Sequence, residues 1–136
     1  MILVACVDDH MGLLFNHRRQ SQDRVLRNRL LALSYGKRLW MNAYSASQFD
    51  NAGPQLHVDP DFLGKAAPGD FCFVEDLDPA PYASQAEEIL LYRWNRLYPA
   101  DLFFTLPLPS AGWQLRQHLD FPGSSHPKIT EEVYSR

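Results

Sequence analysis

The stretch that decides the fold opens the chain: Met1-Ile2-Leu3-Val4-Ala5-Cys6-Val7-Asp8-Asp9. Residues 2–7 are continuously apolar, few in number and partly β-branched, a pattern typical of a strand that is covered on both faces. Strands of this kind lie in the interior of an α/β sheet, where helices cover both sides. We therefore expect residues 2–7 to form an inner strand of an α/β domain.

The residues after this strand predict a loop and then an amphipathic helix. Residues 8–16 are expected to form the loop. Ser21 is expected to cap the helix, with Asp23 in the first turn, where a carboxylate suits the helix dipole. Apolar residues recur at helical spacing over 25–33, and Gly36 is expected to end the helix.

The rest of the chain continues the alternation of short strands and helices. Strands are expected at 39–41, 71–74, 89–92, 102–106, 113–119 and 129–134, and short helical segments at 45–49, 59–63 and 93–98. The last two strands alternate apolar and polar residues, which favours an antiparallel pair with one solvated face. This order predicts a mostly parallel sheet with antiparallel strands at one edge.

Length and composition fit one globular domain that spans residues 1–136. The chain is 46% hydrophobic and 21% charged, which excludes a disordered or fibrous protein. No apolar run approaches the ~20 residues that cross a bilayer, so no membrane partner is expected. The N-terminus lacks the basic leader of a signal peptide, and Cys6 and Cys72 are expected to be free buried thiols, so we expect a cytoplasmic protein.

The charge pattern gives no general attraction to nucleic acid. The net charge is −3, so nucleic acid is not an expected partner. Residues 17–29 hold five arginines against one aspartate, which suits either a phosphate contact or the solvated side of a helix. The sequence leaves the oligomeric state open.

Three stretches, taken in order, resemble the dihydrofolate reductase family. Residues 1–9 resemble the family's first strand, and the loop after them corresponds to its mobile active-site loop. Residues 37–49 resemble the segment in which a strand ends in Met-Gly-Arg and a helix opens on Thr, and Trp113 with residues 125–136 resembles the closing hairpin. The resemblance implies a three-layer α/β fold with a mostly parallel central sheet and an antiparallel C-terminal hairpin.

The resemblance also implies a substrate site. In the family, a carboxylate at the start of the first long helix holds the pterin ring and assists protonation during hydride transfer, and Asp23 occupies that place. A carboxylate buried beside apolar walls is expected to have a raised pKa, which suits a proton donor. Cys6, Val7 and Tyr92 would line the same cleft with Asp23. The alternative is that Asp23 only occupies the first turn of the helix.

The cofactor that the resemblance implies is NADPH. Ser45 keeps a hydroxyl where the family's helix N-terminus meets the pyrophosphate, and Arg93 stands where the family has paired glycines near the cofactor. The sequence departs from the family in that Met41-Asn42-Ala43 lacks the phosphate-holding arginine, and Arg18-Arg19-Gln20 replaces the Pro-Trp of the loop. An ordinary dihydrofolate reductase is therefore not expected.

Three functions follow as hypotheses. The first is a divergent protein of this fold that binds a nucleotide or heterocyclic small molecule, with NADPH-dependent reduction if it catalyses. The second is a non-catalytic protein-interaction module whose cleft is filled by its own aromatic residues. The third, an RNA-processing hydrolase, rests on a similarity to short bacterial proteins labelled ribonuclease Z, although the metal-binding His-x-His-x-Asp-His signature is absent.

Other chemistry-bearing residues favour plainer interpretations. His57, Asp59 and Asp61 are expected to form a polar loop, and we predict no metal site. Ser124-Ser125-His126 lacks the context of a nucleophile elbow and is expected to be a hairpin loop.

Overall fold

A computed structural model describes residues 1–50, 52–110 and 112–136. The strands in this part of the chain are β1 (Ile2–Val7), β2 (Gly12–Phe15), β3 (Arg18–Arg19), β4 (Leu39–Met41), β5 (Leu56–Val58), β6 (Phe71–Phe73), β7 (Glu88–Arg93), β8 (Leu102–Phe103), β9 (Gln114–Phe121) and β10 (Ile129–Ser135). The helices are α1 (Arg24–Leu33), α2 (Ala43–Ala46) and α3 (Phe62–Lys65), with 3-10 turns η1 (Gly53–Gln55) and η2 (Ala80–Gln85).

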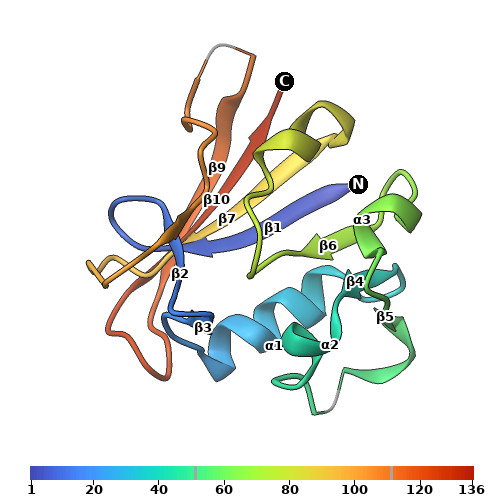
Figure 1. Cartoon of the computed structure of the whole chain (residues 1–136), viewed down its shortest axis with the longest axis horizontal. Coiled ribbons are helices and arrows are strands. Elements are labelled where there is room, and N and C mark those ends of the chain that lie inside the picture. The colour runs from blue at the N-terminus through green and yellow to red at the C-terminus, as the bar shows by residue number, and fades with distance from the viewer. Residues whose placement is uncertain (51, 111) are drawn as a thin grey trace.

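Seven strands form the central sheet, in the order β5-β4-β6-β1-β7-β10-β9 (Figure 1). β1 pairs in parallel with β6 and β7, and β4 pairs in parallel with β5 and β6. β10 runs antiparallel to both β7 and β9. The inner position of the first strand and the antiparallel C-terminal pair are both confirmed. The apolar run at residues 2–7 suits this place because side chains on both faces of β1 are covered.

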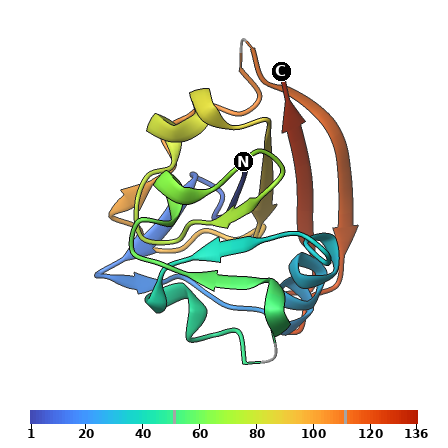
Figure 2. The same cartoon turned by 90° about the vertical axis from the view of Figure 1, so that its right-hand side faces the viewer.

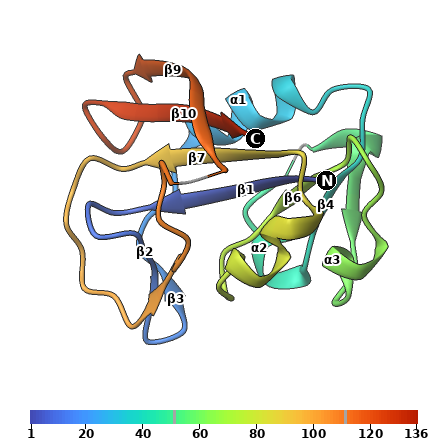
Figure 3. The same cartoon turned by 90° about the horizontal axis from the view of Figure 1, so that it is seen from above.

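Helices cover the two faces of the sheet and create two cores. On one face, Leu26 and Leu30 of α1 pack with Val4 and Tyr92. On the other face, α3, η2 and β2 contribute apolar side chains that pack against Leu3 and other residues of β1 and β7. Figure 3 shows α1 on one side of β1 and β7, with α2 and α3 on the other side. None of the helices in the described residues is long and apolar enough to span a bilayer.

The start of α1 differs from the expectation. Asp23, not Ser21, is the N-cap: its backbone is extended, and its side chain accepts the N–H of Leu26 at 3.0 Å. An aspartate two residues further along competes well for this role because its carboxylate both accepts the free N–H and suits the helix dipole. Gly36, with φ of +78°, follows the helix as expected.

The segment expected to be a loop at residues 8–16 contains strand β2. β2 pairs with β3 and with β8 in a small second sheet of order β3-β2-β8, which lies on the opposite side from β9 and β10 in Figure 2. Asn16 and His17 connect β2 to β3, and both have positive φ, 51° and 60°. Two central residues with positive φ form the tight turn that matches strand twist, a role for which asparagine is favoured.

Other boundaries also differ. Residues 93–98 do not form a helix, because β7 continues to Arg93 and Asn95 then turns the chain with φ of 59°. The strand expected at 102–106 is reduced to β8, in the small sheet. α2 begins before the expected 45–49 segment, because Asn42 caps it by accepting the N–H of Ser45.

Candidate functional site

The predicted site residues gather at the carboxyl ends of β1 and β7. The parallel register places Cys6 beside Tyr92 and Val7 beside Arg93. The carboxyl ends of parallel strands are where open α/β sheets usually bind ligands. The N-terminus of α1 and the loop at residues 122–128, between β9 and β10, complete this end of the sheet, which is therefore the candidate site.

Asp23 is buried at this site, with 3% of its surface exposed. Its Oδ1 accepts the N–H of Leu26, and its Oδ2 accepts both the N–H and the hydroxyl of Ser125, each at 2.7 Å. Burial by itself would raise the pKa of Asp23, but the hydrogen bonds from Ser125 and Leu26 outweigh it and lower the pKa to about 2. The expectation of a raised pKa is wrong, because the carboxylate meets donors rather than apolar walls. At neutral pH this carboxylate is ionised and has no proton to give.

A chain of hydrogen bonds extends from Asp23 towards the surface. Ser125 Oγ lies 2.7 Å from Nδ1 of His126, and Nε2 of His126 lies 2.7 Å from the hydroxyl of Tyr98. Because the ionised Asp23 can only accept, the Ser125 hydroxyl donates to it. Nδ1 of His126 must then carry the proton that it donates to Ser125, and Nε2 accepts from Tyr98. With His126 neutral, each of these hydrogen bonds has one donor and one acceptor.

The surroundings of His126 keep it neutral. His126 is 4% exposed, and its ring stacks on that of Trp94 with centroids 4.7 Å apart. Burial is the main cause that lowers the pKa of His126, and the charge of Arg96 lowers it further, against the opposing effect of Asp23.

The backbone of the 122–128 loop lies directly against the Asp23 carboxylate. A Cβ added at Gly123 would overlap Asp23 Oδ2 and would lie 2.7 Å from Cδ1 of Ile129. Glycine is therefore required for this close approach. The loop therefore covers the Asp23 carboxylate.

Of the other predicted substrate residues, Tyr92 has its polar group already paired, and Cys6 is a free thiol. Tyr92 is fully buried, and its hydroxyl donates to Glu131 at 2.9 Å. Arg29 of α1 binds the same carboxylate through two nitrogens, at 2.9 and 3.0 Å. Burial and the Glu131 carboxylate raise the pKa of Tyr92. Burial raises the pKa of the Cys6 thiol well above its ordinary value.

The two predicted cofactor residues belong to different elements, Arg93 to β7 and Ser45 to α2. Arg93 donates to Glu132 of β10 at 2.5 Å. Ser45 lies on α2 and is 1% exposed, and its hydroxyl has no hydrogen-bond partner among the described residues. The structure thus unites Cys6, Val7, Tyr92 and Arg93 by strand register, whereas Ser45 belongs to a separate helix.

Arg19 of β3 packs against Tyr44 of α2 and pairs with Glu75. Its guanidinium binds both oxygens of Glu75, at 3.0 and 3.2 Å, and lies over the ring of Tyr44 at 4.4 Å. It also donates to the backbone oxygen of Tyr44. These contacts of Arg19 with Glu75 and Tyr44, here called the Arg19 latch, hold the β2–β3 hairpin against α2, the helix that the resemblance assigns to the cofactor.

Neither Asp23 nor Ser45 lines any of five cavities that open in the described part of the chain. Within the same residues, no group of three or more His, Cys, Asp or Glu side chains is placed to hold a metal ion.

Comparison with known proteins decides the fold. No family model and no curated protein matches the sequence. Among solved structures, dihydrofolate reductase from Enterococcus faecalis, complexed with NADP(H) and RAB-propyl, superposes with a TM-score of 0.69 over 99% of this chain and 95% of that chain. The chain has the dihydrofolate reductase fold. The two sequences are 8% identical, so the likeness extends to the dihydrofolate reductase fold alone and assigns no role to Asp23 or Ser45.

Sequence reasoning missed the residues that close the site. Ser125 and His126 were expected only as a hairpin loop, and Arg19 only as one of the arginines at residues 17–29 and as part of the stretch that replaces the family's Pro-Trp. One local signal was available, since Gly123 in a short loop permits a close backbone approach. No local signal pairs Arg19 with Glu75, because their contact depends on the tertiary fold.

Proposed function

We propose that this protein is a non-catalytic binding module that has the dihydrofolate reductase fold and acts through a protein partner. The observation that carries this proposal is the state of Asp23: it is buried, ionised and saturated by donors from its own chain. A proton donor for hydride transfer needs a pKa near the working pH and contact with substrate. Asp23 has neither in this conformation.

A surface patch near the closed site supports the partner. Phe15, Leu97 and Phe103 are 48%, 56% and 40% exposed. Tyr98 and Pro99 join them, since both line one cavity with Leu97 and Phe103 and another with Phe15. Exposed apolar side chains that gather in this way mark protein-binding surfaces, where aromatic residues provide most of the affinity. The fitting partner is a protein with an apolar anchor residue.

Titration with NADPH and dihydrofolate tests the non-catalytic part of the proposal. We expect no saturable change in NADPH fluorescence and no substrate-dependent loss of NADPH absorbance, up to about 1 mM of either compound. A matched titration of Ser125→Gly, which removes the hydroxyl donor to Asp23, shows whether the loop is the obstacle. Saturable NADPH binding by the natural chain with turnover of dihydrofolate would overturn the proposal.

Serine substitutions test the patch. The Phe15→Ser and Phe103→Ser variants should each fail to capture the same specific proteins that the natural chain captures. Val58→Ser is the matched control, because Val58 is also half exposed, at 50%, but lies on β5. Identical captured sets for all three variants would contradict a partner at this patch.

The second candidate function is an NADPH-dependent reductase with Asp23 as a proton relay. It is favoured by the position of Asp23, at the N-terminus of the helix beside the carboxyl end of β1, and by the NADP(H) complex of the structural neighbour. This function requires the 122–128 loop and the Arg19 latch to open. NADPH binding that appears only in Ser125→Gly would support it.

A further inference from the structure

The strand β9 ends the central sheet with its outer side unpaired. β9 is eight residues long and forms one edge of the sheet, at the right-hand margin of the molecule in Figure 2. Residues 114–120 are all exposed. Among the described residues, the main-chain groups of β9 make hydrogen bonds only to β10. A long exposed edge strand of this kind can pair with a strand of another chain.

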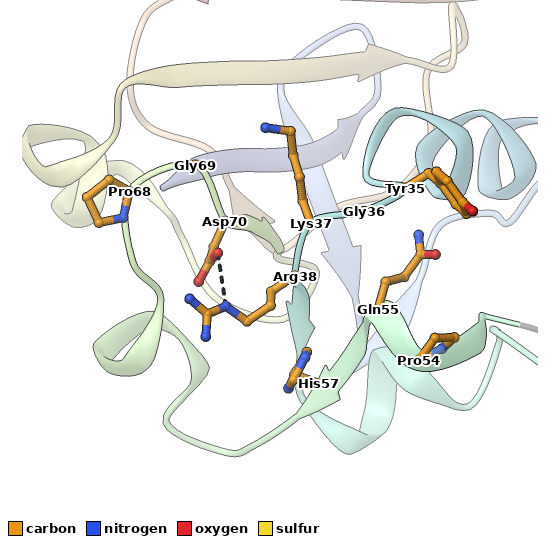
Figure 4. Close-up of a pocket in the computed structure, with 10 residues that line it drawn as sticks. All are labelled: Tyr35, Gly36, Lys37, Arg38, Pro54, Gln55, His57, Pro68, Gly69 and Asp70. Atoms are coloured by element: carbon orange, nitrogen blue, oxygen red, sulfur yellow. Dashed lines mark hydrogen bonds and ion pairs between the residues drawn. The ribbon is translucent and has the colours of Figure 1, made fainter.

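The other strand edges are less suited to pairing. β5, at the opposite edge of the central sheet, is three residues long, and β3 and β8, at the edges of the small sheet, are two residues each. Figure 4 shows the cavity that borders β5, which His57 lines together with the Arg38–Asp70 ion pair. Short edge strands offer few free main-chain groups, which protects them from pairing. Among the described strands, β9 is therefore the edge at which an added strand would gain the most hydrogen bonds.

The regular part of this edge is residues 117–121. Arg116 has no partner residue in β10, because the register shifts there in a β-bulge. Its guanidinium binds Ser135 Oγ at 2.8 Å and Arg136 O at 2.9 Å. A bulge bends the strand and interrupts pairing. At the other end, Pro122 has no N–H to donate. Residues 117–121 lie between these limits and contain no proline, glycine or lysine.

One face of this stretch carries apolar side chains. Leu119 lies opposite Glu131, whose carboxylate binds Arg29 of α1, so the side chain of Leu119 is on the α1 face. Gln117 and Phe121 share this face because side chains alternate along a strand. Leu119 is 45% exposed, so a large apolar side chain at the centre of the stretch is in contact with solvent.

The opposite face of the stretch carries one basic and one acidic side chain. His118 and Asp120 lie opposite Glu132 and Thr130 of β10. Asp120 accepts the hydroxyl of Thr130 at 2.6 Å through Oδ1. Its Oδ2 and the His118 ring make no hydrogen bond among the described residues. Both side chains are exposed and are therefore available to another chain.

These side chains complement one another in one antiparallel register of two copies. With the register centred on Leu119, this leucine faces Leu119 of the second copy, and Gln117 faces Phe121. On the other face, His118 of each copy faces Asp120 of the other copy. Directly opposed side chains lie about 4.5–5.5 Å apart at Cβ, where apolar pairs and pairs of opposite charge stabilise a sheet. A histidine donates an N–H to a carboxylate whether it is neutral or protonated.

We propose that β9 pairs with β9 of a second copy of this chain, antiparallel and centred on Leu119, so that two central sheets join edge to edge. The same residues supply both members of each pair, as a twofold interface requires. This complementarity favours a second copy over an unrelated strand. The surface is separate from the Phe15, Leu97 and Phe103 patch, so the pairing stands whether or not that patch binds a protein.

Sedimentation equilibrium of the whole chain tests the pairing. Because a contact through one edge strand is small, we expect a reversible dimer with a dissociation constant of about 1–100 μM. The measured mass should rise with concentration from that of one chain towards that of two. A mass that stays at one chain up to about 500 μM would overturn the proposal.

A lysine at the centre of the register tests the site. Leu119→Lys places two ammonium groups opposite each other and should raise the dissociation constant at least ~10-fold. Val58→Lys is the matched control, because Val58 is also half exposed but lies on the other edge strand, β5, and it should leave the constant unchanged. Equal constants for the two variants would overturn the proposal.

A charge exchange tests the register. His118→Asp places carboxylates opposite each other and should weaken the dimer, since like charges at facing positions destabilise a sheet. Adding Asp120→His to this variant restores opposite partners and should return the dissociation constant to near that of the natural chain. A double variant as weak as the single variant would overturn the register centred on Leu119.

Cysteine cross-linking reports the same register without relying on affinity. Residues that face their own copy are close enough for a disulfide, so Leu119→Cys should give a covalent dimer on mild oxidation. Gln117→Cys is the matched control on the same face of β9, and it should give much less, because Gln117 faces Phe121. Burial raises the pKa of Cys6 and Cys72, so the natural thiols do not compete. Equal yields from the two variants would contradict the pairing.

Discussion

Replacing Asp23 with asparagine should reduce stability by an amount that depends on pH. Asparagine caps helices nearly as well as aspartate, so Asp23→Asn keeps the bond to the Leu26 N–H and removes only the charge that holds Ser125. The native pKa of Asp23 is about 2, against an ordinary value of 3.8. The ionised form is therefore favoured by folding.

The magnitude follows from linkage. A pKa that is lower in the folded state adds stability above the unfolded value of 3.8, and this stability is lost as pH falls through the folded value of about 2. A shift of this size corresponds to about 2 kcal/mol at pH 7. Ser125 is exposed, and solvent weakens its interaction with Asp23, so this free energy is an upper limit. The contribution should fall to about 1 kcal/mol at pH 3 and below about 0.5 kcal/mol at pH 2.

Urea unfolding at pH 7, 5 and 3 measures this difference between the natural chain and Asp23→Asn. Asp9→Asn is the matched control, since Asp9 is an exposed aspartate at the same end of the sheet, and it should change stability by less than about 0.5 kcal/mol. A loss for Asp23→Asn that is the same at pH 7 and pH 3, or no loss at pH 7, would refute the linkage argument.

Three further predictions concern the same region and the buried thiol. Gly123→Ala should destabilise the chain by about 1–3 kcal/mol in urea unfolding, because its Cβ overlaps the Asp23 carboxylate; an unchanged midpoint would show that the loop does not lie there. Nitrogen-15 NMR of His126 should show the ring proton on Nδ1 at pH 7 and a pKa below 6.5. Because folding favours the neutral ring, His126 adds stability above pH 6.5, and this stability is lost at lower pH. A proton on Nε2 instead would contradict the hydrogen bonds to Ser125 and Tyr98. Cys72, whose pKa burial raises to about 12, should resist iodoacetamide at pH 7 in the folded protein, and rapid alkylation counts against its burial.

Much of the fold could be predicted from local patterns. The continuous apolar run at residues 2–7 correctly indicated an inner strand, and the alternation near 129–134 correctly indicated the antiparallel edge. These two predictions succeed because the burial of one or both faces of a strand determines the spacing of apolar residues in the sequence. The helix expected at 93–98 was wrong because short aromatic and basic stretches carry no decisive period, and Asn95 turns the chain instead.

The candidate site was predictable in position but not in state. Strand order places Cys6 beside Tyr92, so their proximity follows from the parallel pairing of β1 and β7. The state of Asp23 depends on Ser125, 102 residues further along the chain. No local pattern in the sequence reports a hydrogen bond of that separation, and the sign of a pKa shift depends on such partners. The expected proton donor is therefore an ionised helix cap.

The pH titration of the Asp23 side-chain carboxyl carbon, followed by carbon-13 NMR, tests the account most directly. The hydrogen bonds from Ser125 and Leu26 predict a midpoint near pH 2. A midpoint at or above pH 4 would mean that the carboxyl is neither capped nor covered as described, and it would return Asp23 to the role of a proton donor.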